Sequence, residues 1–133
     1  MKVKKILSFV LLLTILFSIG AVSANATTIK LNYVHISDVS NGLEPSGNTL
    51  YVTASTSGYF DATRCGVTAT LQRQSGSSWS NYKVWSKSSN SDYVLFGTSI
   101  NVPSGRYRLV TSHSVSVGSS TEYEGMTSDI VDV

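Results

Sequence analysis

Apolar and polar residues alternate along short stretches of this chain, most clearly at residues 64–74 and 105–117. In the first stretch one parity holds Cys65, Val67, Ala69 and Leu71, and the other parity holds mainly threonine and glutamine. In the second stretch tyrosine, leucine and valine alternate with arginine and serine. A period of two is that of a β-strand, whose successive side chains point to opposite faces. An apolar and a hydroxyl-rich face on each strand indicate antiparallel sheets with one solvated side.

Clusters of Gly, Ser, Asn, Pro and Asp interrupt this alternation and predict where strands end. Seven strands are predicted, at about 28–38, 48–56, 64–74, 79–87, 93–101, 105–117 and 125–133. The links between them are predicted at SNGLEPSGN, SGYFDA, SGSS, SSNSD, VPSG and VGSSTEYEG, and residues 74–78 are predicted to turn a β-hairpin. About seven strands in roughly 105 residues predict an all-β fold, a single antiparallel two-sheet sandwich.

The N-terminus has the layout of a secretory signal peptide. Lys2, Lys4 and Lys5 precede an apolar run over residues 6–19, and Ala24 and Ala26 fit an A-x-A cleavage site. The apolar run is short for a transmembrane span, so an uncleaved anchor is the less favoured alternative. We therefore expect a signal peptide at 1–26, a β-sandwich domain at 27–133, a secreted, extracellular protein, and no stable membrane insertion after signal removal.

The charge of the expected mature chain differs from that of the whole. Ten Lys and Arg against eight Asp and Glu give +2, but three lysines lie within residues 1–26, which leaves seven against eight, or −1. A nearly neutral surface gives no electrostatic reason to expect nucleic acid or an anionic membrane as a partner.

The segment NVPSGRYRLVTSHSV resembles the penultimate strand of bacterial immunoglobulin-like domains. In those folds a tyrosine at the position of Tyr107 bonds back to the preceding loop, so the resemblance implies a structural Tyr107, with TSDIVDV as the final strand. The chain departs from the family in having no cysteine pair between the sheets. Leu71, Leu109 and the single Cys65 are expected to be structural as well, with Cys65 either buried or free to pair with a partner.

A second resemblance is carried by LQRQSGSSWSNYKVWS and, about twenty residues later, VPSGRYRL. Together they are similar to small secreted Firmicutes proteins that carry one β-rich domain of unknown function. The likeness spans about 71–117, and it implies a secreted Gram-positive β-domain without implying an activity.

Exposed aromatic side chains would let such a domain stack on sugar rings. The candidate binding residues are Trp79, Trp85, Tyr123, Arg106 and Arg108, with Tyr59, Phe60 and Tyr82 as further aromatic contacts. Filling of the core competes for the same aromatics. Along a regular strand Trp79 and Trp85 share one face and Tyr82 takes the other, unless a bulge intervenes. We expect Tyr82 inside and at least one tryptophan partly exposed.

The possible catalytic and metal-binding residues do not form a recognised motif in the sequence. His35 and His113 lie on different predicted strands, and His113 is expected to be a hydrogen-bonded sandwich residue, or one near the exposed end of its strand, rather than a metal ligand. Glu122 and Glu124 could offer oxygen ligands to a weak Ca²⁺ site, but a solvated acidic edge is favoured. Ser80 and Lys83 match Ser-x-x-Lys, yet residues three apart on a strand point to opposite faces. We expect no cofactor, no metal and no enzymatic activity.

The sequence therefore favours a secreted non-catalytic binding or interaction module at the cell envelope or outside the cell, whose partner is an extracellular glycan or protein. Two alternatives stay open. The fragments SNYK and HSVSVG resemble parts of small secreted β-sandwich bacteriocins of the lactococcin type, which implies a toxin. The chain could also be a self-assembling matrix component or a secreted inhibitor.

Overall fold

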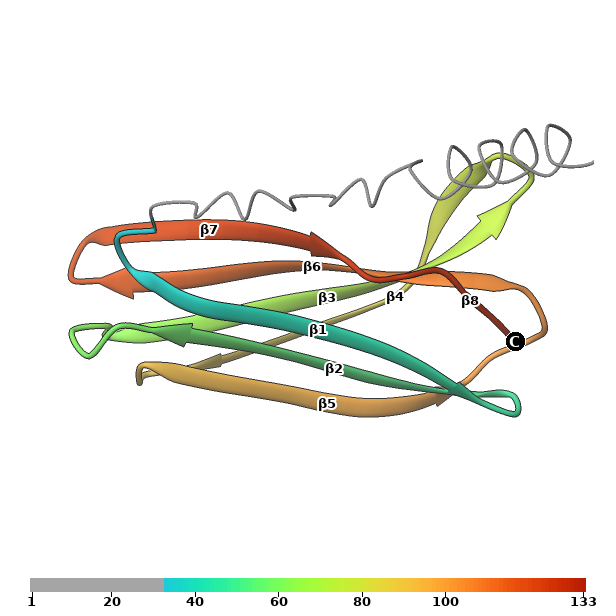
Figure 1. Ribbon diagram of the computed structural model, residues 1–133, viewed down its shortest axis with the longest axis horizontal. Coiled ribbons are helices and arrows are strands. Elements are labelled where there is room, and N and C mark those ends of the chain that lie inside the picture. The colour runs from blue at the N-terminus through green and yellow to red at the C-terminus, as the bar shows by residue number, and fades with distance from the viewer. Residues whose placement is uncertain (1–32) are drawn as a thin grey trace, which may run out of the picture. The chain divides into compact units, whose positions relative to one another are not determined.

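The computed structural model describes residues 33–133, and these form eight β-strands and no helix (Figure 1). The predicted signal peptide and residues 28–32 of the predicted strand at 28–38 lie outside the described residues, and the described part becomes strand only from Ile36. Within 33–133 no helix is long and apolar enough to cross a membrane. The strands are β1 (Ile36–Ser46), β2 (Thr49–Gly58), β3 (Arg64–Ser75), β4 (Ser78–Ser89), β5 (Tyr93–Asn101), β6 (Arg106–Val117), β7 (Ser120–Thr127) and β8 (Val131–Asp132).

The strands form two antiparallel sheets that pack face to face. The first has the order β1-β2-β5 and the second the order β4-β3-β6-β7, with the short β8 pairing β6 beyond the end of β7 (Figure 1). This confirms the expected all-β two-sheet sandwich. In constant-type immunoglobulin domains the fourth strand belongs to the first sheet. Here β4 pairs with β3 instead, so a three-stranded sheet faces a sheet that is four strands wide.

Three of the hairpins turn through two residues that begin with glycine. Gly47, Gly76 and Gly118 have φ of 56°, 61° and 58°, and no other kind of residue in the described chain has positive φ. Positive φ at the first central position alone is the geometry of the type II′ turn, whose twist matches that of the flanking strands. The turn predicted at 74–78 is thereby narrowed to Gly76 and Ser77.

Two predicted links are strands in the structure. SNGLEPSGN was expected to be a loop, but β1 continues to Ser46 and pairs with β2 from end to end. Its inward Leu43 is buried, so packing and the ladder outweigh the turn preference of Asn, Gly and Pro. VGSSTEYEG was also expected to be a link, but only Gly118 and Ser119 turn, and β7 begins at Ser120. The predicted strand at 125–133 is correspondingly replaced by the end of β7 and by β8.

The core consists of two apolar clusters. One gathers around Leu50, Leu71 and Leu109, and the other around Cys65 and Val115. Tyr107, Cys65, Leu71 and Leu109, which the sequence marks as structural, have no exposed surface. The Tyr107 hydroxyl donates to the Pro103 carbonyl at 2.7 Å, which is the corner bond that the immunoglobulin-like resemblance implies.

A chain of hydrogen bonds lies in the core beside these clusters. The Thr56 hydroxyl donates to the Gly66 carbonyl at 3.1 Å, so its oxygen is left to accept from Nδ1 of His113 at 2.8 Å. Nε2 of His113 then accepts from the Thr111 hydroxyl at 2.8 Å, and Thr111 accepts from the Asn41 amide at 3.1 Å. Every member is satisfied when His113 is neutral with its proton on Nδ1. His113 is thus the hydrogen-bonded sandwich residue that the sequence predicts.

Candidate functional site

The outward face of the four-stranded sheet is covered by polar side chains. The register places the even-numbered residues of β3 and β6 on this face, because their odd-numbered neighbours are buried between the sheets. Serine and threonine dominate the middle of the face, and neighbouring hydroxyls bond across strands, as Thr68 does with Ser86 at 3.0 Å. The hydroxyl groups of Ser86, Ser88 and Ser112 are exposed and accessible to a polar ligand.

An open hollow of about 330 Å³ lies on this face, around Gly66 on β3. It is lined by Arg64, Gly66, Val67, Thr68, Ser86, Lys87, Ser88, Ser112, Ser114 and Tyr123. Gly66 lacks the side chain that would fill the hollow, since a Cβ there would come within 2.8 Å of the Ser114 hydroxyl. Glycine inside a strand often marks a place where another molecule approaches closely.

The wall of the hollow combines an aromatic ring with one cationic side chain. Tyr123 on β7 pairs with Ser114 and is 69% exposed. Arg64 reaches across to donate to the Ser88 hydroxyl at 2.9 Å. Lys87 borders the hollow with its backbone carbonyl, because its side chain shares the inward direction of its partner Val67. No carboxylate lines the hollow. The site therefore offers hydroxyl partners, one stackable ring and positive charge.

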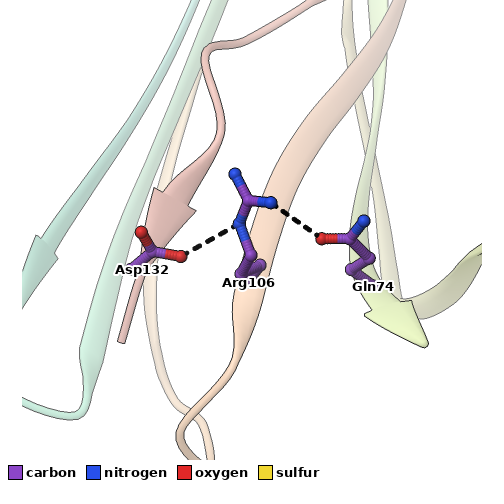
Figure 2. A network of polar contacts seen from close by, with 3 residues as sticks. All are labelled: Gln74, Arg106 and Asp132. Carbon is purple, nitrogen blue, oxygen red and sulfur yellow. Dashed lines mark hydrogen bonds and ion pairs between the residues drawn. The ribbon is translucent and has the colours of Figure 1, made fainter. Parts of the chain in front are cut away.

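At the other end of the same face two arginines, Arg106 and Arg108, are held by neighbouring side chains, and Figure 2 shows the contacts of Arg106. Arg106 donates to Asp132 at 3.1 Å and to the Gln74 amide oxygen at 3.2 Å. Arg108 donates to Gln72 at 2.8 Å, and its guanidinium stacks 4.4 Å from the centre of the Trp79 ring. The guanidinium groups of Arg106 and Arg108, which were expected to contact a ligand, are thus already bonded to other side chains. Arg108 also covers one face of the Trp79 ring.

The predicted binding residues do not form one platform. Trp79 is opposite Gln74, and Tyr123 lies beside Ser114, which pairs with Gly66. Gln74 and Gly66 are eight positions apart on β3, so about 26 Å separates the two aromatics along the strands. Tyr123 and Trp79 therefore belong to different ends of the sheet.

A bulge separates the two tryptophans, although they have the same parity. The register of β4 shifts between Leu71 and Gln72, where Lys83 and Asn81 are the partners and Tyr82 is the extra residue. Trp79 faces outward with Gln74, whereas Trp85 faces inward with Ala69 and packs against Phe96 at 5.9 Å between ring centres. Both tryptophans are partly exposed, which agrees with the expectation for at least one of them.

Tyr82 differs from its expected position. It was expected inside, but it is 41% exposed, and only the edge contact of its ring with Tyr107 turns it toward the core. The bulge leaves it at the border of the sheet, where one side of the ring has no neighbour strand. Tyr59 and Phe60 are also exposed, Phe60 almost completely, in the link between β2 and β3.

The net charge is nearly neutral, yet the outer faces of the two sheets carry charges of opposite sign. The strands of the larger sheet place Arg64, Arg106 and Arg108 outward and place no carboxylate there; Asp132 joins only at the end, on β8. The outward positions of β1 carry Asp38 and Glu44, with no cation on that face. Composition could not reveal this separation, because it depends on which sheet each strand joins.

Sequence reasoning missed a polar cluster at the start of the described chain. His35 Nε2 lies 3.0 Å from the Ser120 hydroxyl, and the Glu122 carboxylate accepts the amide protons of Val34, His35 and Ile36 at 3.0, 2.8 and 2.7 Å. Burial raises the pKa of Glu122, but the three amide bonds outweigh it and the pKa is lowered overall. Both carboxylate oxygens of Glu122 accept from backbone amides, so Glu122 does not orient the His35 ring as the carboxylate of a catalytic triad would.

Cys65 carries the one thiol of the chain, and it is buried in the second apolar cluster. Removal from water raises the pKa of this thiol, which opposes formation of the reactive thiolate. Residues 33–133 also hold no group of three or more His, Cys, Asp or Glu that could bind a metal ion.

Comparison with known proteins identifies no family. No family model matches the chain, and no curated protein matches it. Among solved structures the chain is similar to one titled "Solution Structure of R. palustris CsgH", with 12% identity, coverage of 67% of this chain and 89% of that chain, and a TM-score of 0.40. A likeness at this level carries no functional argument. The resemblance to secreted Firmicutes proteins stays a prediction.

Proposed function

We propose that this protein is a secreted, non-catalytic β-sandwich that binds an acidic extracellular glycan in the hollow around Gly66. The observation that carries the proposal is the combination within that hollow of hydroxyl groups, the Tyr123 ring and the Arg64 cation, without a carboxylate. The expected signal peptide at residues 1–26 supports the extracellular location.

The chemistry of the hollow matches that of a sugar. Hydroxyls such as those of Thr68, Ser86 and Ser112 can both donate and accept, as the ring hydroxyls of a glycan require. An exposed tyrosine ring offers an apolar face for the C–H side of a sugar ring. Arg64 favours a glycan that bears carboxylate or phosphate groups. A volume of about 330 Å³ is near the lower end for ligand sites, which suits one or two sugar units.

The experiment measures retention of the mature chain on purified cell wall and on an array of neutral and acidic glycans. We expect binding to acidic members, and Tyr123→Ala should weaken it about tenfold, equivalent to about 1.4 kcal/mol. Tyr51→Ala is the matched control, because Tyr51 is 51% exposed on the outer face of the other sheet. Its affinity should equal that of the unaltered protein.

Gly66→Ala gives an independent test, since the added methyl group enters the hollow against Ser114. It should weaken binding while the folded state, followed by circular dichroism, is retained. Absence of binding to both cell wall and glycans would refute the proposal. Equal losses of affinity in the Tyr123 and Tyr51 variants would show that the ligand does not bind in the hollow.

A further inference from the structure

The smaller sheet leaves space for one more strand beside β5. The two sheets are three and four strands wide, and β5 packs over both β3 and β4. On β2 the inward Leu50, Val52 and Thr56 have no exposed surface. On β5 the inward Phe96 and Ile100 remain partly exposed, and so does Trp85 of β4 beneath them. The core is therefore incompletely covered along this side.

The free edge of β5 offers a regular set of backbone groups. The Val102 amide donates to Asn48, and the Asp92 carbonyl accepts from Gly58, so the even-numbered residues here direct their backbone groups toward β2. Backbone direction alternates along a strand. The amides and carbonyls of Leu95, Gly97, Ser99 and Asn101 consequently point away from β2, toward a position that no described strand occupies. Those of Tyr93 point the same way but are bonded to the Ser91 hydroxyl.

The other three edge strands carry features that prevent strand addition. β1 has Glu44, Pro45 and a register shift between Ile36 and Asp38. β4 has its bulge and two inward lysines, and β7 has two inward glutamates. Charges, proline and bulges are the usual means of blocking an edge.

β5 has none of these features. Its nine residues include no charge and no proline, and its register with β2 is unbroken. Leu95 on this strand is 53% exposed.

The position beside β5 also has a defined chemistry. On β4 the side chains directed toward it are Lys83, Trp85 and Lys87, since their partners on β3 are the buried Leu71, Ala69 and Val67. Neither lysine is in a salt bridge with the described residues. An added strand would place successive inward side chains over a cation, an aromatic ring and a second cation.

We propose that the free edge of β5 binds an extended segment of a partner protein, in which acidic and apolar residues alternate at the inward positions. Backbone hydrogen bonds to β5 supply the affinity of such an added strand, and the side-chain positions supply its specificity. The segment extends the three-stranded sheet to four strands and covers Trp85 and Phe96.

Synthetic peptides test this proposal directly. The probe TETVTETVT places Glu and Val alternately on one face, and TKTVTKTVT reverses its charge. Binding is followed through Trp85 fluorescence in a Trp79→Phe background, and hydrogen exchange is measured at the amides of Leu95, Gly97 and Ser99. We expect the acidic peptide to bind at least tenfold more tightly than the basic one and to protect these three amides.

Two further variants separate strand addition from general charge attraction. The double substitution Lys83→Glu and Lys87→Glu should reverse the preference between the two peptides. A form of TETVTETVT that is N-methylated along its bonding edge should lose binding, and it leaves the protein itself unaltered. Equal binding of both charge forms, or no protection of the β5 amides, would overturn the proposal. So would a concentration-dependent dimer that protects these amides without peptide, because the occupant would then be a second copy of the chain.

Discussion

Replacing Thr56 by valine removes the central hydroxyl of the buried chain that joins Gly66, Thr56, His113 and Thr111. Valine has nearly the same shape as threonine, so the change removes hydrogen bonds without opening a cavity. Thr56 and His113 have no exposed surface, so water cannot replace the lost partner. The Nδ1 proton of His113 is left without an acceptor, and Gly66 loses one of its donors.

The cost follows from the penalty for an unsatisfied buried group. One such group costs about 1–3 kcal/mol, and the added methyl group of valine recovers part of that. We therefore expect Thr56→Val to lower the free energy of unfolding by about 2 kcal/mol. For a domain of this size the loss corresponds to a fall in Tm of about 10 °C.

The measurement is equilibrium unfolding in urea at pH 7.5, followed by circular dichroism. Thr53→Val is the matched control, because Thr53 lies on the same strand but points outward and is exposed. Its free energy of unfolding should stay within about 0.5 kcal/mol of that of the unaltered protein. If Thr56→Val is as stable as Thr53→Val, the buried hydrogen bonds of Thr56 to Gly66 and His113 do not contribute to stability.

Three other predictions concern single groups of the core. Burial lowers the pKa of His113 from its ordinary value of 6.5, although Glu124 and the Ser55 backbone oppose the shift. As the pH falls, the unfolded chain therefore binds a proton at His113 before the folded protein does. The free energy of unfolding is not reduced by this effect above pH 6.5, and it decreases as the pH falls from 6.5 toward the lowered pKa. The slope is at most about 1.4 kcal/mol per pH unit. Urea unfolding from pH 7.5 to 5 should show this slope, and His113→Gln should lack it; equal slopes would contradict the assignment. Tyr107→Phe removes the hydrogen bond to Pro103 and should lower the free energy of unfolding by about 1 kcal/mol in the same assay. An unchanged urea midpoint would mean that this bond does not contribute to stability. Cys65 should resist a thiol reagent in the native protein and react on unfolding in urea; rapid native labelling would show that the second cluster opens readily.

The local pattern of the sequence was sufficient wherever a strand is buried on one face and bounded by strong turn residues. β3 and β6 lie within one residue of their predicted ranges, since their buried residues, such as Cys65, Val67 and Leu71, recur at every second position. The glycine turn at Gly76 and the corner bond of Tyr107 also depend on residues close together in the chain. These features need no knowledge of which strands become neighbours.

Tertiary structure decided the features that depend on pairing between distant segments. The ladder with β2 carries β1 through Asn41, Gly42 and Pro45, which would favour a turn in isolation. The bulge at Tyr82 reverses the parity of β4, so Trp79 and Trp85 face opposite sides. A one-residue shift in register moves every later side chain to the other face, and no local sequence pattern predicts where such a shift occurs.

The candidate sites depend on the same kind of information. Gly66, Tyr123 and Arg64 come together because β3, β6 and β7 are neighbours, and Tyr123 was the only member of this hollow among the predicted binding residues. The free edge of β5 exists because β4 pairs with β3 and leaves the smaller sheet one strand narrower. The sequence by itself determined strands such as β3 and β6 and their buried faces, through a period of two that each of these strands carries alone. Only the tertiary structure decided which outer faces and edges those strands present, because the choice of neighbours is made across the whole chain.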